Sequence, residues 1–381
     1  MRSWDIFCTV VDNYGDVGVC WRLARQLAAE HGFRVRLWID DLASFRRICA
    51  DIVTGVESQH SHGVEVRWWR EVFPAVDPAD VVVEAFACNP PANYIAAMAA
   101  KRPKPVWINL EYLSAENWVL GCHGLPSPHP SLPLVKHFFF PGFVAGTGGL
   151  LAERGLAPAR ERFQRSSAEQ ARLWQDLELP APRAGDIQVS LFCYPHGGIS
   201  GLLRAWAAGG TPLRCLVPEG TATAALSAFF GTDRLAPGAI LRKSGLEVGI
   251  FAFLDQDRYD RLLWACDFNL VRGEDSFVRA QWAARPLLWQ IYPQQEGAHR
   301  PKLQAFLDLY CDGLATETKA LVVKLWQAWN AGDDVVVEAA WPGFWERRIE
   351  LQAHAQRWAA RLAGTGNLAN NLVQFCGNLL K

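Results

Sequence analysis

The chain has 381 residues, of which half are apolar and a fifth are charged. This length allows two domains of ordinary size, and this composition is typical of a folded globular protein rather than a disordered one. Lys and Arg (38) nearly balance Asp and Glu (39). No global electrostatic field therefore favours nucleic acid or an anionic membrane, and neither is expected as a partner.

The ten cysteines are scattered and never form a Cys-x-x-Cys pair. Several lie in apolar runs, such as Cys8 and Cys193, which favours buried free thiols in a reducing compartment over disulfides or a zinc site. The N-terminus shows no signal-peptide pattern. The most apolar later window, Leu132–Leu151, is interrupted by prolines, glycines and Lys136, so it is not expected to span a bilayer. A cytoplasmic protein is expected.

The first 110 residues alternate between short apolar runs and segments with helical spacing of apolar residues. Strands are expected at Trp4–Val11, Arg34–Ile39, Val64–Trp69, Val81–Phe86 and Val106–Leu110. Helices are expected at Val19–His31 and Tyr94–Ala100. Alternation of this kind predicts an α/β fold with a mostly parallel sheet covered by helices on both faces.

From about residue 121 to 182 the alternation is lost. Prolines and the glycine-rich run Gly142–Gly149 predict loops, followed by a polar helix at about Ser167–Leu177. This loop-rich segment, near 150–182, is expected to connect two domains.

A second α/β series follows. Strands are expected at Ile187–Tyr194, Leu213–Pro218, Val248–Phe253, Phe268–Val271 and Leu287–Tyr292. Helices are expected at Arg258–Ala265, Phe277–Ala284 and Lys302–Tyr310, and from Lys319 onward. Two doubly wound halves predict one cleft between them, and ligands of such sheets bind at the carboxyl ends of the strands.

The turn after the first predicted strand carries two carboxylates, Asp12 and Asp16. Gly15 and Gly18 allow a sharp turn and close approach of a ligand. The spacing matches neither the dinucleotide fingerprint nor a P-loop, so hydride transfer loses its usual support. Two interpretations remain open here. Asp16 is either a helix N-cap with Asp12 as a turn residue, or one carboxylate faces a ligand as a base or anchor.

The turn Arg272-Gly273-Glu274-Asp275-Ser276 joins a predicted strand to a predicted helix. With Ser276 as N-cap, the backbone N–H groups of the helix start would bind a pyrophosphate. Gly273 would allow close approach, Arg272 would offset the phosphate charge, and Glu274 and Asp275 would face sugar hydroxyls. The alternative is a charged loop with a capping serine.

Two further segments are candidates to line the same cleft. Phe253 is suited to stacking on a base and Gln256 to reading its edge, while Tyr194 is placed to donate to a phosphate. Aromatic residues at strand ends are more often part of the core. The segment His60-Ser61-His62 has no matching ligand cluster in the sequence and is expected to be a solvated loop.

Longer motifs carry a resemblance to a known family. They are Val10–Gly18, Asn109–Glu116, Phe140–Phe143 with Thr147–Leu150, and Arg272–Phe277 with Trp289–Gln294. Over essentially the whole chain, these segments resemble the bacterial protein-arginine rhamnosyltransferases that modify translation elongation factor P, the EarP family.

The resemblance implies a GT-B fold, in which two Rossmann-like domains face each other across a cleft. Residues 1–180 would form the acceptor-side domain, 183–355 the nucleotide-sugar domain, and 356–381 C-terminal helices that pack back towards the first domain. The implied donor is dTDP-β-L-rhamnose, and the implied acceptor is one arginine in the N-terminal domain of elongation factor P. Transfer would invert the anomeric carbon, with no cofactor and no metal.

Residue roles follow from the matching motifs. Asp16 would be the catalytic carboxylate and Glu274 a second essential acid, with Asp12 sharing or orienting the role of Asp16. Because a guanidinium is a poor nucleophile, we expect Asp16 to pair with it and take a proton as the C–N bond forms. The expected donor contacts are Asn13, Tyr14, Gly15, Asp16, Tyr194, Phe253, Leu254, Asp255, Gln256, Arg272, Gly273, Glu274, Asp275 and Ser276.

Other functions compete with this interpretation. A GT-B transferase with a small-molecule acceptor is the nearest alternative. A non-catalytic nucleotide-sugar or protein-binding module would keep the fold but has no need of the pair Asp16 and Glu274. A nicotinamide oxidoreductase is disfavoured by the missing glycine fingerprint.

Overall fold

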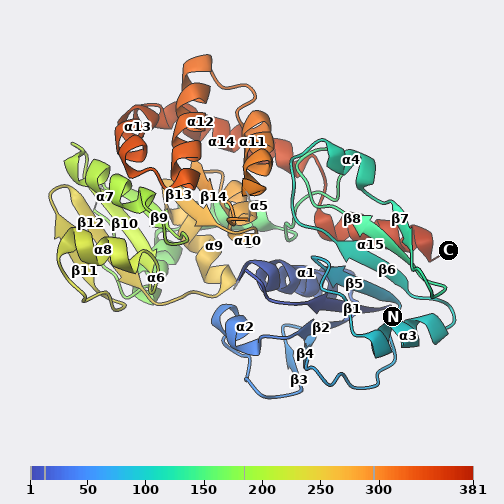
Figure 1. Cartoon of the computed structure of the whole chain (residues 1–381). Helices are drawn as coiled ribbons and strands as arrows, with labels where there is room; N and C mark the ends of the chain where they lie inside the picture. The colour runs from blue at the N-terminus through green and yellow to red at the C-terminus, as the bar shows by residue number, and fades with distance from the viewer. Residues whose placement is uncertain (1, 13, 184, 295–296, 381) are drawn as a thin grey trace. The chain divides into compact units, whose positions relative to one another are not determined.

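The computed structural model describes residues 2–12, 14–183, 185–294 and 297–380. The chain forms two compact units, the first made of Met1–Arg154 and Arg361–Lys381, the second of Gly155–Ala360 (Figure 1). This division differs from the one expected from the sequence, because residues 155–180 belong to the second unit. Among the described residues, no helix is both long enough and apolar enough to cross a membrane.

The first unit is built on a sheet with the strand order β3-β4-β2-β1-β5-β6-β8-β7. Its inner strands are parallel, and the short edge strands β3 and β7 are antiparallel to their neighbours. The bounds are β1 Ser3–Cys8, β2 Arg34–Ile39, β3 Ser58–Ser61, β4 Val64–Trp68, β5 Val81–Ala85, β6 Val106–Leu110, β7 Pro126–Pro128 and β8 Val135–Phe139.

The central strands of this sheet are buried on both faces. All five residues of β5 and all five of β6 are buried, as expected for parallel strands covered by helices. A large aromatic cluster fills one side, where Phe7 packs against Trp38, Phe73 and Tyr94. Burial of such side chains supplies the main free energy that holds this unit together.

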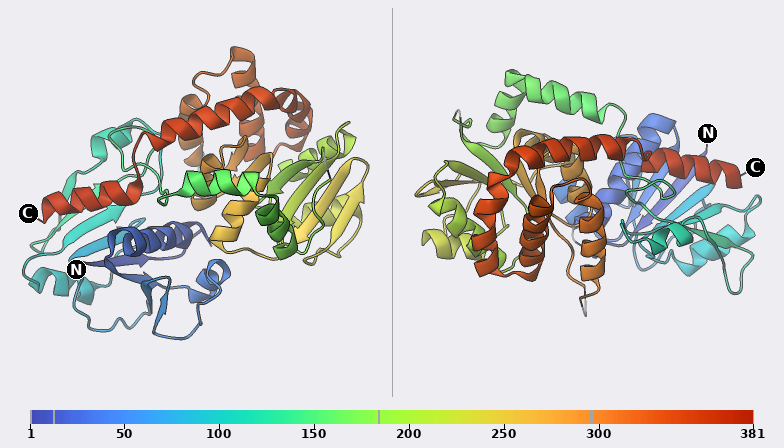
Figure 2. Two further views of the ribbon diagram at one scale, coloured as in Figure 1. Left: turned by 180° about the vertical axis from the view of Figure 1, so that it is seen from behind. Right: turned by 90° about the horizontal axis from the view of Figure 1, so that it is seen from above.

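Helices cover both faces of the first sheet. They are α1 Gly15–His31, α2 Leu42–Ile48, α3 Ala92–Ala100, α4 Trp118–Cys122 and α15 Leu368–Leu379. The chain moves from β1 to β2 through α1 and in the opposite direction, from β5 to β6, through α3. Because such crossovers are right-handed, α1 and α3 lie on opposite faces. The C-terminal helix α15 packs against α1 (Figure 2).

The second unit contains a sheet with the order β11-β12-β10-β9-β13-β14, parallel except for the edge strand β11. The bounds are β9 Ile187–Leu191, β10 Leu213–Pro218, β11 Ile240–Lys243, β12 Leu246–Phe251, β13 Phe268–Arg272 and β14 Leu287–Gln290. In chain order, the chain first steps from β9 to β10 and β12, then crosses to the other side of β9 for β13 and β14.

The helices of the second unit pack on this sheet and on each other. Their bounds are α5 Leu156–Arg165, α6 Ser167–Asp176, α7 Gly198–Ala208, α8 Thr223–Phe230, α9 Gln256–Ala265, α10 Asp275–Trp282, α11 His299–Tyr310, α12 Thr316–Ala331, α13 Asp334–Glu346 and α14 Arg348–Ala363. Helices α5 and α6 contact α9, so the expected linker is part of the packed unit. Four tryptophans of the C-terminal helices are buried, Trp326, Trp329, Trp341 and Trp358, and Trp345 is half-buried.

Several predicted elements have the expected bounds, and others do not. The strands Arg34–Ile39, Val106–Leu110 and Leu213–Pro218 are confirmed residue for residue. Helix α1 begins at Gly15 rather than Val19. The region expected to form loops contains β8, whose parallel pairing with β6 extends the first sheet.

Candidate functional site

In the second unit, the carboxyl ends of β9 and β13 bring three side chains together. These strands are neighbours at the point where the strand order reverses, which is where doubly wound sheets bind ligands. The guanidinium carbon of Arg272 lies 4.5 Å from the ring centroid of Phe192 and 4.5 Å from that of Tyr194. Two cation–π contacts therefore hold the charge of Arg272 at this edge of the sheet.

The turn after Arg272 is held by the neighbouring strand. Gly273 has a φ of 65°, a left-handed conformation that glycine adopts without strain. Its carbonyl oxygen accepts a hydrogen bond of 2.7 Å from Trp289 Nε1, and the Trp289 ring stacks on Phe277 of α10 with centroids 3.9 Å apart. These contacts fix the direction in which the backbone enters α10.

The start of α10 differs from the prediction. Ser276 was expected to be the N-cap, but the N-cap residue is Glu274 and the helix begins at Asp275. The Glu274 side chain does not cap the backbone N–H groups of this helix start. An anion is a suitable partner for such groups.

A second helix start, that of α9, is tied to the first. Gln256 Nε2 donates to Asp275 Oδ2 over 3.0 Å, and both residues are buried. Asp255 is the N-cap of α9, accepting from the Arg258 backbone N–H at 2.8 Å. Asp255, expected to contact a donor, therefore has a capping role in this structure.

The remaining predicted residues of this unit lie at the same edge. Phe253 is half-buried, with its ring centroid 6.1 Å from that of Phe192, and Leu254 is buried. The Tyr194 backbone N–H donates to Gln290 Oε1 over 2.7 Å. The predicted positions thus gather around the ends of β9, β12 and β13.

Sequence reasoning missed Phe192, Gln290 and Glu219. Gln290 ends β14, and Glu219 follows β10 with its Oε1 3.4 Å from the Phe253 backbone nitrogen. Glu219 directly follows the strand predicted at Leu213–Pro218, and Phe192 and Gln290 lie near the ends of the strands predicted at Ile187–Tyr194 and Leu287–Tyr292, which was the available signal. What the sequence does not show is the strand order that makes them neighbours.

In the first unit, Asp16 lies at the start of α1, directly after the loop that follows β1. Its side chain is buried, with 2 % of its surface exposed. Oδ2 accepts two hydrogen bonds, from the backbone N–H of Val11 at 2.9 Å and of Asp12 at 2.8 Å. The helix N-cap is Tyr14, so the interpretation of Asp16 as the N-cap is wrong. It holds the loop before the helix, through Oδ2.

The other predicted residues of this turn pack tightly. A Cβ added to Gly15 would lie 2.7 Å from Asp12 Oδ2, so a larger residue at position 15 would displace the Asp12 carboxylate. Tyr14 is half-buried. Asn13 lies outside the described residues.

A strained loop follows β5, the neighbour of β1 at the reversal point of the first sheet. Phe86, Ala87 and Asn89 all have positive φ, between 51° and 56°. Such strain in non-glycine residues clusters at functional sites. The Phe86 ring stacks on Tyr112, which follows β6, with centroids 4.3 Å apart and planes 16° apart. This aromatic pair was not predicted and offers a flat surface on which a guanidinium could stack.

The cysteines near these turns are poor nucleophiles. A side-chain hydrogen bond with Cys20, together with burial, raises the pKa of Cys8. Burial also raises the pKa of Cys88, and it raises the pKa of Cys193 to about 12. Because only the thiolate reacts, the chemistry available at the two turns belongs to carboxylates, Arg272 and backbone N–H groups.

Known proteins resemble this chain over its whole length. The family model for the elongation factor P rhamnosyltransferase EarP matches residues 4–377. Protein-arginine rhamnosyltransferases of Pseudomonas putida and Pseudomonas aeruginosa are 50 % and 48 % identical, and these matches cover 99 % and 100 % of this chain and of each relative.

Solved structures agree. One that describes EarP-mediated arginine glycosylation of translation elongation factor EF-P is 36 % identical with a TM-score of 0.70, covering 99 % of both chains. The calicheamicin glycosyltransferase CalG4, 14 % identical with a TM-score of 0.52 over the full length of both chains, shares the fold alone. The fold is that of the GT-B glycosyltransferases, and the chain belongs to the EarP family of elongation factor P rhamnosyltransferases.

Proposed function

We propose that this protein transfers L-rhamnose from dTDP-β-L-rhamnose to one arginine side chain in the N-terminal domain of translation elongation factor P. Transfer inverts the anomeric carbon and requires neither a metal ion nor a cofactor. Membership of the EarP family supports this function, as do relatives about half identical that are protein-arginine rhamnosyltransferases. The function implies a cytoplasmic protein.

The second unit binds the donor in this proposal. The backbone N–H groups at the start of α10 and the Arg272 guanidinium stabilise the charge that develops on the diphosphate as it leaves. The stacking of Arg272 between Phe192 and Tyr194 supports this role, because it fixes the guanidinium before substrate arrives. Phe253 stacks on the base, Gln256 reads its edge, and Glu274 contacts the sugar.

Asp16 of the first unit activates the acceptor. The observation that carries this assignment is a buried carboxylate that, within the described residues, accepts its two backbone hydrogen bonds through Oδ2. Oδ1 then pairs with the guanidinium, favours its reactive orientation, and takes a proton as the C–N bond forms and the nitrogen becomes acidic. Asp12 orients the same group from above Gly15.

The alternative is a small-molecule acceptor, and mass spectrometry distinguishes the two. Purified protein is incubated with elongation factor P and dTDP-β-L-rhamnose, and intact acceptor mass and peptide fragmentation are recorded. We expect the gain of one deoxyhexosyl group on one arginine, with α-configuration by NMR. No gain on the protein, or modification of a residue other than arginine, contradicts the proposal.

The same assay tests the metal-free mechanism. Prior dialysis against EDTA should leave the initial rate unchanged within about twofold, since the leaving group is stabilised by fixed charges of the protein. A retained anomeric configuration would contradict a single displacement. A rate that falls with EDTA while the circular dichroism spectrum is unchanged, and that returns with a divalent cation, would contradict metal independence.

A further inference from the structure

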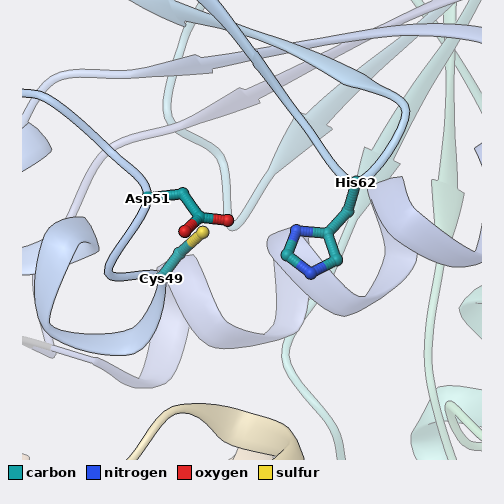
Figure 3. Close-up of side chains that lie close together, drawn as sticks. All are labelled: Cys49, Asp51 and His62. Carbon is teal, nitrogen blue, oxygen red and sulfur yellow. The ribbon is translucent and has the colours of Figure 1, made fainter.

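Three metal-binding side chains of the first unit meet away from both turns. A sulfur, a carboxylate oxygen and a ring nitrogen of Cys49, Asp51 and His62 lie within 4.8 Å of one another. Figure 3 shows the Asp51 carboxylate beside the Cys49 sulfur and the His62 ring turned towards both. The segment 60–62 was expected to be a solvated loop without a matching cluster. That expectation is wrong, because Ser61 ends β3 and His62 faces two ligand-type residues from another segment.

The backbone places His62 firmly. Ser61 pairs with Val64 at the end of the β3–β4 hairpin, and His62 and Gly63 between them both have positive φ, 49° and 78°. This is the two-residue turn that suits the twist of a hairpin. The His62 ring also packs edge-on against Trp21 of α1, with centroids 5.7 Å apart. The imidazole is therefore presented by a built turn rather than by a loose loop.

Cys49 and Asp51 come from the end of α2. Cys49 is the C-cap of this helix and is 4 % exposed, while Asp51 is exposed two residues later. The Ser61 hydroxyl lies 2.8 Å from His62 Nδ1 and 3.6 Å from Cys49 Sγ. The Ser61 hydroxyl therefore lies within hydrogen-bond distance of both the imidazole and the thiol.

We propose that Cys49, Asp51 and His62 bind one Zn²⁺ ion, with water as the fourth ligand. Thiolate, imidazole and carboxylate together suit zinc, whereas Mg²⁺ and Ca²⁺ require oxygen ligands. Metal–ligand distances of about 2.0–2.3 Å place ligand atoms roughly 3.5 Å apart. Closing the observed separations requires a shift of about 1 Å, which the exposed Asp51 and the His62 ring can supply by side-chain rotation.

The charges of the site are compatible with a divalent cation. A thiolate and a carboxylate together neutralise the charge of Zn²⁺. When the metal takes the ring nitrogen, the Ser61 hydroxyl can donate to the thiolate, a stronger acceptor than the thiol. The bound ion links the end of α2 to the β3–β4 hairpin and stabilises the first unit by binding only its folded form. This proposal does not rest on the transfer reaction.

Zinc and cobalt binding by the full chain test the proposal. Metal-free protein is titrated with Zn²⁺ in equilibrium dialysis and with Co²⁺ in absorption spectroscopy, where a thiolate ligand gives a charge-transfer band. We expect one tight Zn²⁺ per chain and a cobalt–thiolate band. Cys49→Ser and His62→Asn should each weaken binding at least about 100-fold, because losing an outer partner alone costs about 10–100-fold. Asparagine also tolerates the left-handed conformation at position 62.

Matched controls separate the site from other thiols and histidines. Cys122→Ser changes a half-buried cysteine elsewhere, and His60→Asn changes an exposed histidine two residues away. Both should bind Zn²⁺ as the wild type does. Circular dichroism and dTDP binding show that each variant is folded. The proposal is overturned if the wild type binds no stoichiometric zinc, or if folded Cys49→Ser and His62→Asn variants bind it as tightly as the two controls.

Discussion

The carboxylates of Asp16 and Asp40 both accept hydrogen bonds from the backbone segment that follows β1, residues 10–12. Asp16 Oδ2 accepts from the N–H groups of Val11 and Asp12, and Asp40 Oδ1 accepts from those of Val10 and Asp41. Both carboxylates therefore stabilise the strand-to-helix turn after β1. Only Asp16 is proposed to act on the acceptor, so the pair allows a structural role to be separated from a chemical one.

Asparagine substitutions at Asp16 and Asp40 distinguish the structural role of these carboxylates from a chemical one. An amide oxygen still accepts from a backbone N–H, but the charge-assisted part is lost, so each variant should lose about 1 kcal/mol of unfolding free energy. Turnover should fall at least about 100-fold in Asp16→Asn, which loses the proton acceptor, and by less than about threefold in Asp40→Asn. Denaturant unfolding and the acceptor mass assay measure both. Equal losses of turnover in the two variants would show that Asp16 matters only for the loop.

At the residue scale, the sequence predicted positions better than roles. Asp16, Arg272 and Gly273 were singled out because they follow strands. The caps were assigned wrongly: Glu274, not Ser276, is the N-cap of α10, and Asp255 caps α9. Capping depends on where the helix backbone begins, and a charged turn offers several side chains that satisfy the same preference.

At the element scale, hydrogen bonds join α15 to the segment 148–150, shortly before the chain first leaves unit 1 at residue 154. The Leu368 backbone N–H donates to the Leu150 carbonyl over 3.0 Å, and Asn371 Nδ2 donates to the Gly148 carbonyl over 3.0 Å. Between these contacts, Gly149 has a φ of 75°, and an added Cβ would lie 2.5 Å from the Gly366 carbonyl oxygen. Residues more than two hundred positions apart in the sequence thus approach so closely that no side chain fits.

This close approach predicts a difference between two glycine substitutions. Gly155 has a φ of 84° with nothing within 4 Å of an added Cβ, so Gly155→Ala should cost only the backbone strain, about 1–2 kcal/mol. Gly149→Ala adds a clash with a backbone oxygen and should cost about 1–3 kcal/mol more. Urea unfolding measured by tryptophan fluorescence compares them. Equal midpoints would mean that the Gly366 carbonyl oxygen does not approach Gly149 as closely as described.

Elements were predicted where apolar periodicity is strong and missed where it is weak. The buried strand Val106–Leu110 is apolar except for one asparagine, and its predicted bounds are the bounds in the structure. Strand β8 was missed because Val135 is exposed, Lys136 and His137 are polar in type, and prolines surround it. Its partner β7 begins and ends with proline, which is tolerated only because β7 lies at the sheet edge.

At the scale of the whole molecule, each unit repeats one topology. In both sheets the chain first builds outwards from the first strand on one side and then crosses to the other. The turn after β1 and the turn after β13 each lie beside such a reversal point. The alternation of elements predicted the fold class and the rule for ligand position, but strand order arises from contacts between distant residues, so Phe192 and Gln290 escaped notice.

The stability of the molecule should depend on His196, a half-buried histidine whose two ring nitrogens are buried. Burial lowers the pKa of His196 to about 4, from about 6.5 in an unfolded chain. Its ring packs edge-on against Trp329 with centroids 4.1 Å apart, and both ring nitrogens are buried without a hydrogen-bond partner within the described residues. Between about pH 6.5 and 4 the unfolded chain therefore binds a proton that the folded chain does not.

The free energy of unfolding should therefore fall as the pH falls, because the unfolded chain gains a proton on His196 that the folded chain does not. The contribution of neutral His196 is fully present above pH 6.5 and is lost as pH falls towards 4, by at most about 1.4 kcal/mol per pH unit. His196→Leu removes both the titration and two unpaired nitrogens, so unfolding free energies measured by urea from pH 7.5 to 4.5 should fall less steeply than in the wild type. His60→Leu, the same change at an exposed position, should keep the wild-type slope. If His196→Leu keeps that slope as well, the folded protein accepts a proton on His196, and the ring lies in a wetter environment than its packing against Trp329 indicates.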